Sequence, residues 1–328
     1  MTTQQATNSH SITLNDRISG AVWGQFVGDA FCLGSHWIYD LKELQSRFPG
    51  GPHGFEEPAA GHYHAGKKAG ELTHYGDAAL LLLRSMMERN RFDAADFGAR
   101  FVGMIECPGY VGYRDHAAKG TVANYRAFRE LHPDAAYSFQ DGADDDQPAT
   151  ISRLAPLSAR YHGTGDYLAQ VERLTRVCQN NERAVDYVTG HALVLRELFN
   201  GTGLGDSFAA AAEQLPANSE AAAGISQARA QAALPVLEAT LKFGQSCPLP
   251  SSFPAATHCA LQHEADFAAA LRATAAAGGD NAARAAMIGA WLGAAHGIGA
   301  IPVAWREKLA ARNEISAGVT WLCSHVNE

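Results

Sequence analysis

Two stretches of this 328-residue chain carry glycine at every fourth position, and each stretch meets an aspartate at one end. The glycines are Gly20, Gly24 and Gly28 in the first stretch and Gly289, Gly293 and Gly297 in the second. In a helix, positions four apart lie close to one face, so each series forms a stripe without side chains. Because a glycine inside a helix costs about 0.5–1 kcal/mol relative to alanine, three in a row indicate close approach of a neighbouring backbone.

The two glycine stripes predict a pair of helices that pack closely and bring two carboxylates to one place. Asp29 directly follows the first stripe, and Asp280 precedes the second. On spacing alone, the alternative is tight packing with incidental aspartates.

The rest of the sequence is typical of an all-α protein. Strand-like alternation of Val, Ile and Thr is missing, and the alanine excess fits closely packed helices. We therefore expect a compact orthogonal helical bundle, with Asn15 or Asp16 as the cap of its first helix. The segments expected to contain helices are 15–32, 78–89, 110–132, 156–200, 208–243, 266–277 and 282–299.

Length and composition indicate a single domain over residues 15–328, preceded by a mobile tail over residues 1–14, because no linker divides the chain. A formal net charge of −8 gives no support for a nucleic-acid or anionic-membrane partner. No apolar run approaches the roughly 20 residues that span a bilayer. The start lacks the apolar core of a signal peptide, and six scattered cysteines fit a reducing compartment. We expect a cytoplasmic protein.

The first candidate for chemistry is the segment 73–77 (THYGD), which precedes an apolar helix. Thr73 or Asp77 can cap that helix, because a side-chain oxygen accepts an unpaired amide of the first turn. A helix start is the simpler interpretation. In the functional interpretation, His74, Tyr75 and Asp77 form an acid/base set, since a histidine titrates near neutrality and a carboxylate can orient it.

Two further candidates are a glycine turn and a histidine pair. Residues 278–281 (GGDN) also lead into a helix, where paired glycines let a ligand approach the backbone and a helix N-terminus favours an anion such as phosphate.

His62 and His64 lie in a glycine-rich passage over 49–70. Their spacing suits a metal ion, but no carboxylate or cysteine nearby completes a ligand set.

Several segments resemble the ADP-ribosylglycohydrolase family. Residues 24–30 (GQFVGDA) resemble its opening G-x-x-x-G-D-A motif, and residues 153–157 (RLAPL) resemble its central R-x-A-P-L element. Residues 278–293 are similar to its closing G-G-D-T-D-T signature, and residues 300–305 to the segment that follows. These matches run in order over residues 17–309. The resemblance implies an all-α fold that hydrolyses the bond between ADP-ribose and a protein side chain or small acceptor, using two magnesium ions.

The metal motifs depart from the family pattern. Residues 73–76 (THYG) stand where the family has T-D-D-T, and residues 282–283 (AA) replace an aspartate and a threonine of the closing signature. Of the family's ligand positions, the resemblance leaves Thr73 and Asp280. Because magnesium requires near-octahedral oxygen coordination, we expect no pair of magnesium ions and no other cofactor. A single weakly held magnesium ion on Asp280, Asp29 and water stays open.

The T-H-Y-G variant resembles the branch of the family related to J1-crystallin and selenoprotein J, and two hypotheses follow. In the first, the chain hydrolyses a ribosyl or ADP-ribosyl glycosidic bond of a small-molecule or ADP-ribosylated substrate, with little or no magnesium. Two nearby carboxylates can do so when one has a raised pKa. In the second, it is a catalytically silent ligand-binding or structural, crystallin-like protein. The roles in the hydrolase hypothesis are Asp280 or Asp77 as base, His74 or Tyr75 as acid or substrate anchor, Asp29 as orienting group, and Thr73, Gly278, Gly279, Asn281 and Arg153 as substrate contacts.

Overall fold

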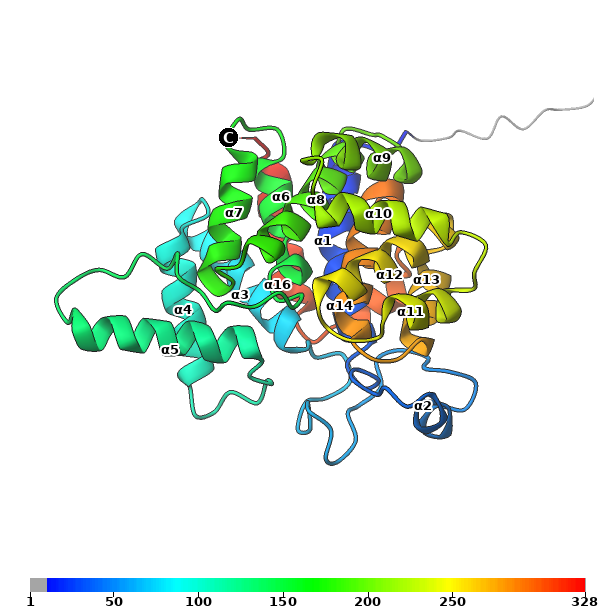
Figure 1. Cartoon of the computed structure of the whole chain (residues 1–328), viewed down its shortest axis with the longest axis horizontal. Coiled ribbons are helices and arrows are strands. Elements are labelled where there is room, and N and C mark those ends of the chain that lie inside the picture. Colours follow the sequence, from blue (N-terminus) through cyan, green and yellow to red (C-terminus); the bar gives the residue numbers. More distant parts are fainter. Residues whose placement is uncertain (1–10, 328) are drawn as a thin grey trace, which may run out of the picture.

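The computed structural model describes residues 11–327, and this part of the chain is built from helices (Figure 1). It contains sixteen α-helices and two short 3-10 helices, with no β-strand among the described residues and only two isolated β-bridges. The predicted all-α class is confirmed. In chain order the elements are α1 (Leu14–Phe31), α2 (Leu41–Arg47), α3 (His74–Arg89), α4 (Ala94–Glu106), α5 (His116–Leu131), η1 (Ile151–Arg153), α6 (Ala155–Tyr161), α7 (Tyr167–Cys178), α8 (Glu182–Phe199), α9 (Leu204–Gln214), α10 (Glu220–Ala230), α11 (Val236–Phe243), α12 (Leu249–Gln262), α13 (Phe267–Ala276), α14 (Asn281–His296), η2 (Ile298–Ala300), α15 (Val303–Lys308) and α16 (Arg312–Ser324).

Helices α1 and α14 form an antiparallel pair near the centre of the molecule (Figure 1). Gly20 faces Gly293 and Gly24 faces Gly289, so a Cβ atom added to any of the four would overlap the carbonyl group of its counterpart. The third glycine of α1 continues this contact against the backbone of Ala285. Thus the predicted packing of the two stripes, backbone against backbone, is confirmed.

Gly297, the last glycine of the second stretch, has a different role. It is the C-cap of α14 and has a φ of 73°, in the left-handed region that favours glycine. A Cβ atom there would meet Ile12 and Asp16 beside the start of α1. Gly297 thus lies just past α14 and ends the helix, but its backbone still faces the first stripe, since a Cβ atom at Gly20 would lie 2.8 Å from the Gly297 carbonyl carbon.

The start of α1 also differs from the sequence prediction. Thr13 is the cap, and not Asn15 or Asp16, because Thr13 and Asp16 exchange hydrogen bonds in a capping box. Leu14 consequently belongs to the helix and not to the predicted tail. Residues 1–10 of that tail lie outside the described part of the chain.

Two other helices begin at a polar cap that stands outside the apolar run. α3 starts at His74, four residues before the apolar segment, because the side chain of Thr73, one of the two predicted caps, accepts the backbone amide of Tyr75. α5 starts at His116, within the segment expected to contain a helix, because Asp115 accepts a first-turn amide. Both capping side chains are buried.

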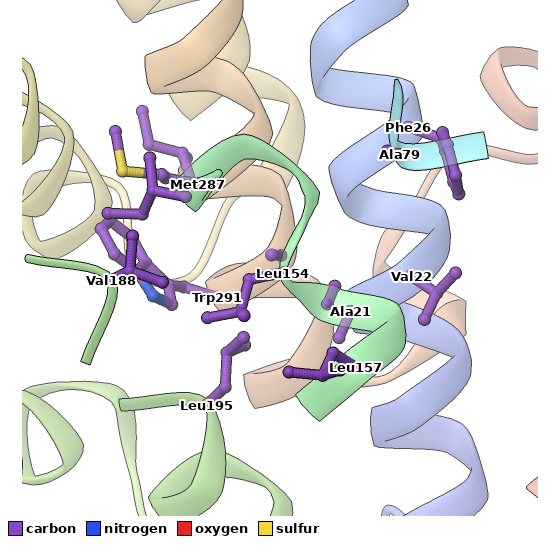
Figure 2. Close-up of a cluster of buried hydrophobic side chains, with 14 of the residues drawn as sticks. Ala21, Val22, Phe26, Ala79, Leu154, Leu157, Val188, Leu195, Met287 and Trp291 are labelled. Carbon is purple, nitrogen blue, oxygen red and sulfur yellow. The ribbon is translucent and has the colours of Figure 1, made fainter. Parts of the chain in front are cut away.

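Helix α14 is buried along nearly its whole length, from Asn281 to Ala295, as expected for a helix that is apolar on all sides. Its Trp291 side chain lies beside Leu154, Val188 and Leu195 in the cluster that Figure 2 shows. Neither α14 nor any other described helix is long and apolar enough to cross a membrane.

Candidate functional site

Three helix N-termini and the last turn of α1 meet around a group of buried polar side chains. Thr73, Asp115 and Asp280 are the caps of α3, α5 and α14, and each accepts a backbone amide of its own helix. Asp29 and Asp280 both bond to the start of α3, the first through Thr73 and the second through Tyr75. Two helix ends that are far apart in sequence therefore carry their carboxylates to one place.

Asp29 holds the first turn of α3 in position. Its carboxylate accepts the backbone amide of Thr73 at 2.7 Å, the Thr73 hydroxyl, and the backbone amide of Gly76 at 3.2 Å. A Cβ atom at Gly76 would overlap this carboxylate, so the glycine makes room for it. Burial raises the pKa of Asp29 to about 6, although the bonds from Thr73 oppose this shift. The contacts of Asp29 are those of a structural anchor.

The raised pKa of Asp29 gives a pH dependence to the free energy of unfolding. Since the folded-state pKa of about 6 exceeds the ordinary value of 3.8, the folded state binds this proton more tightly than the unfolded state. The resulting stabilisation is complete below pH 4 and is lost as the pH rises through 6. Relative to Asp29→Asn, the wild-type protein should lose about 1–3 kcal/mol between pH 4 and 7 in urea unfolding. Parallel pH profiles of the two proteins would contradict this.

Asp280 is fully buried and pairs with the phenol of Tyr75. The Tyr75 hydroxyl donates to Asp280 Oδ2 at 3.1 Å, and His36 Nδ1 lies 3.7 Å from Asp280 Oδ1. Burial raises the pKa of Asp280, while an interaction with Cys247 lowers it. Burial also raises the pKa of Tyr75 well above its usual range, so Tyr75 keeps its proton and acts as the donor.

The glycine turn before Asp280 is filled by the chain itself. Gly278 and Gly279 have φ angles of 67° and 63°, which favour glycine. The Gly279 amide donates to the carbonyl of Ile38 at 2.8 Å, and its carbonyl accepts the amide of Trp37 at 2.8 Å. A Cβ atom at Gly279 would overlap the backbone of Gln245. The sequence predicted a ligand at this turn. In the structure the turn instead pairs with the segment after α1.

Asn281 and Arg153, two predicted substrate contacts, are buried among protein groups. The Asn281 amide donates to the Ser35 hydroxyl at 3.0 Å. Arg153 is 2% exposed, donates to the Cys178 sulfur at 3.2 Å and lies over the ring of Phe101 at 5.4 Å. A phosphate or ribose has no open path to either side chain in this arrangement.

Asp77 has partners of its own, one turn further along α3. Its carboxylate accepts Lys67 Nζ at 2.8 Å and the Tyr110 hydroxyl at 2.9 Å. Burial raises the pKa of Asp77, and Lys67 lowers it. Asp77 therefore belongs to a separate ion pair. The other predicted residues of this region, Asp29, Thr73, Tyr75 and His74, lie close to Asp280.

A cluster of three buried histidines lies next to Asp280. One ring nitrogen each of His36, His64 and His74 falls within 4.8 Å of the other two. Trp37 packs against all three rings, with centroids 4.2–5.6 Å apart. The sequence pointed to His64 with His62, but His62 instead bonds to the carbonyl of His36 at 2.7 Å. His74 belongs to the segment 73–77, but His36 comes from the segment after α1, so local spacing could not reveal its contact with His64.

A cleft of about 290 Å³ adjoins the histidine cluster and opens to solvent. Trp37 and Asp115 connect it to the histidines, since Asp115 Oδ2 lies 3.3 Å from His74 Nε2. A wider hollow of about 850 Å³ lies between the starts of α8 and α10, away from these residues. None of the predicted site residues is among the described residues that line the cleft, which are Trp37, Tyr39, Tyr63, Tyr113, Asp115, His116, Lys119, Gln147 and Cys247.

Two magnesium ions at this place would require free carboxylate oxygens. Both oxygens of Asp29 accept hydrogen bonds from the start of α3, and Asp280 accepts from Tyr75. Residues 282–283 offer methyl groups, and the fully buried cation of Arg284 stands one turn away from Asp280. The donor set does not fit a magnesium pair.

The all-α fold and the ordered motifs define the class of protein. A model of the ADP-ribosylglycohydrolase family matches residues 10–327. The chain belongs to the ADP-ribosylglycohydrolase family.

Relatives of this chain include two crystallins of Tripedalia cystophora. Crystallin J1A is 28% identical over 306 residues, which cover 92% of this chain and 94% of that protein. Crystallin J1B is 26% identical over 308 residues, with the same coverage. A solved structure described as an ADP-ribosylglycohydrolase-related protein complex is 22% identical and matches with a TM-score of 0.71, over 95% of this chain and 98% of that one. The predicted resemblance to the family and to J1 crystallins is confirmed.

Proposed function

We propose that this chain is a ligand-binding member of the family and that its aromatic cleft holds a small molecule of the ADP-ribose type. The observation that carries the proposal is the contrast between two neighbouring places. Asp29 and Asp280 are 1% and 0% exposed and are bonded to protein donors, which include the fully buried phenol of Tyr75 at Asp280. The cleft beside them is open.

The walls of the cleft suit a flat, polar ligand. Trp37, Tyr63 and Tyr113 contact one another edge to face, with ring centroids 4.8–5.5 Å apart. Such a corner of amphipathic rings can hold a purine or ribose face. Lys119 Nζ lies 5.5 Å from the Tyr113 ring centre, and His116 is exposed beside it. Lys119 offers positive charge to a diphosphate, and family membership supports the ADP-ribose class.

Binding can be tested by calorimetry with ADP-ribose. We expect a micromolar dissociation constant, weakened about tenfold by Tyr63→Ala, because the ligand loses one aromatic wall. Lys119→Met should weaken ADP-ribose more than adenosine, since only ADP-ribose carries phosphates. Matched controls are Tyr137→Ala and Lys42→Met, which lie outside the cleft. No heat of binding at millimolar ADP-ribose would refute the proposal.

Hydrolysis with little or no magnesium is the second candidate, and it is favoured by two carboxylates beside the cleft. Burial raises the pKa of Asp145, whose carboxylate accepts His116 Nδ1 at 2.8 Å. Burial has the same effect on Asp115, but its contacts with His74, the Ala118 amide and Arg153 together lower the pKa. Carboxyl groups with opposite pKa shifts fit the acid and the base of glycosidic hydrolysis.

An assay of ADP-ribose release separates the two candidates. A binding protein should release none from ADP-ribosylated peptides or small acceptors at any magnesium concentration. Release without added magnesium that Asp145→Asn abolishes would support the second candidate over the first. Release that requires magnesium and disappears in Asp280→Ala would contradict both, because it would restore the two-metal reaction of the family.

A further inference from the structure

We propose that His36, His64 and His74 form a binding site for one transition-metal ion of the zinc class. All three side chains are buried, and one ring nitrogen of each lies within 4.8 Å of the other two. The proposal goes beyond ligand binding in the cleft and does not depend on it. It also differs from a magnesium pair in ligand type, metal and number of ions.

The buried ring nitrogens of the cluster lack hydrogen-bond partners. They are Nε2 of His36, both ring nitrogens of His64 and Nδ1 of His74, whose Nε2 faces Asp115. A buried polar atom without a partner costs about 1–3 kcal/mol, so four in one place would be costly. A metal ion that accepts one lone pair from each ring removes much of this cost.

The three rings are held in place by their surroundings. His36 Nδ1 lies 3.3 Å from the backbone amide of Ala282 and 3.7 Å from Asp280 Oδ1. With Nε2 bound to a metal, Nδ1 carries the proton of the neutral ring, and Asp280 is the acceptor within reach. Asp115 lies 3.3 Å from His74 Nε2, and a carboxylate behind a histidine is common at metal sites because it fixes the ring and strengthens the donor. His62 Nδ1 accepts the backbone amide of His64 at 3.1 Å and so holds the loop that carries His64.

Trp37 closes one side of the cluster. Its ring stacks on His36 and His64 at interplanar angles of 28° and 15°. Trp37 has a φ of 59°, which is uncommon for a bulky residue, and its amide is bonded to Gly279. Backbone strain of this kind persists where the surrounding structure requires it. Here it places an indole between the histidines and the cleft.

The ligand chemistry selects the kind of metal. Three neutral imidazoles suit zinc, cobalt, nickel or copper, whereas magnesium prefers oxygen. Three histidines with a fourth position for water is a common arrangement for zinc, with Zn–N bonds of about 2.0–2.1 Å. In a tetrahedron this places the nitrogens about 3.4 Å apart. The rings would therefore move together by roughly 1 Å on binding.

A single buried histidine without partners would not carry this proposal. His191 is also fully buried with both ring nitrogens unpaired, and it packs alone against Trp291 at 5.2 Å. The metal site requires three such rings meeting at one point. His191 is for that reason the matched control, since His191→Phe removes an equally buried imidazole away from the cluster.

The test is a titration of the full-length chain with Co²⁺ after removal of metals by a chelator. We expect one equivalent of Co²⁺ to bind with the visible absorption of tetrahedral coordination, and Zn²⁺ to displace it. His64→Phe should weaken binding at least about 100-fold, because a ligand is lost. His191→Phe should bind as the wild type does. Thermal melting without metal shows whether each variant is folded, and His64→Gln serves if the phenylalanine variant is not.

Three results would overturn the proposal. One is the absence of stoichiometric Co²⁺ or Zn²⁺ binding to the wild-type protein, which would leave ordered water as the partner of the rings. Another is unchanged binding in folded His64→Phe or His64→Gln, which would place the ion elsewhere on the protein. The third is equal weakening by His191→Phe, which would show a general loss of structure.

Discussion

Gly24→Leu and Gly293→Leu should each lower the free energy of unfolding by about 3 kcal/mol or more, which is the upper range for overpacked cores. The reason is that the first atom of any side chain at either position would overlap a backbone carbonyl, and a backbone cannot change rotamer to make room. The two helices would have to separate along their length. Urea unfolding of the purified variants measures the effect, and failure to accumulate as soluble protein is its extreme form.

Gly103→Leu is the control for these variants. Gly103 lies within α4, is exposed, and has no atom within 4 Å of an added Cβ. Leucine there should stabilise the protein by about 0.5–1 kcal/mol, because it removes the conformational cost of a helical glycine. If Gly24→Leu and Gly103→Leu had the same stability, the close contact between α1 and α14 would be wrong.

Asp29→Ala should lower the free energy of unfolding by about 3–5 kcal/mol. Three donors at the start of α3 lose their acceptor, namely the amide and hydroxyl of Thr73 and the amide of Gly76. Each buried donor left unpaired costs about 1–3 kcal/mol, and α3 loses its anchor to α1. Urea unfolding at pH 7 measures the change.

The control for Asp29→Ala is Asp206→Ala, in the exposed first turn of α9. It should cost no more than about 1 kcal/mol, because only a favourable helix-end charge is lost. A stable Asp29→Ala protein that no longer binds or turns over ligand would show instead that Asp29 belongs to the working site.

The sequence was most informative where one physical cause explained a pattern. Glycines four apart inside a helix have few explanations besides close backbone contact, so the pairing of α1 with α14 could be predicted. Helix starts were predicted less evenly: Thr73 was one of two predicted caps of α3, whereas the caps Thr13 and Asp115 of α1 and α5 were not predicted. Gly297 fitted the spacing of the stripe, but its positive φ cannot be read from the sequence.

The candidate site was predictable only in part. The motifs placed Asp29, Tyr75 and Asp280 at helix ends, and they do meet. Whether a buried carboxylate anchors a helix or awaits a substrate depends on which donors reach it, and the same residue types serve both purposes. The histidine cluster could not be predicted, because His36 and His64 come together only through tertiary folding.

The contact between α1 and α14 determines which neighbouring residues can be substituted without moving the two helices. Side chains can adjust to a neighbour. The distance and register of two helices that pack through side chains therefore change when those residues are substituted. Here carbonyl groups lie directly against glycine α-carbons, so the separation and the register of the two helices are fixed by backbone dimensions alone. Their ends therefore present Asp29 and Asp280 in a constant frame. Residues that lie near these carboxylates, such as the three clustered histidines and Tyr75, can be exchanged for others of different chemistry while the two helices keep their arrangement.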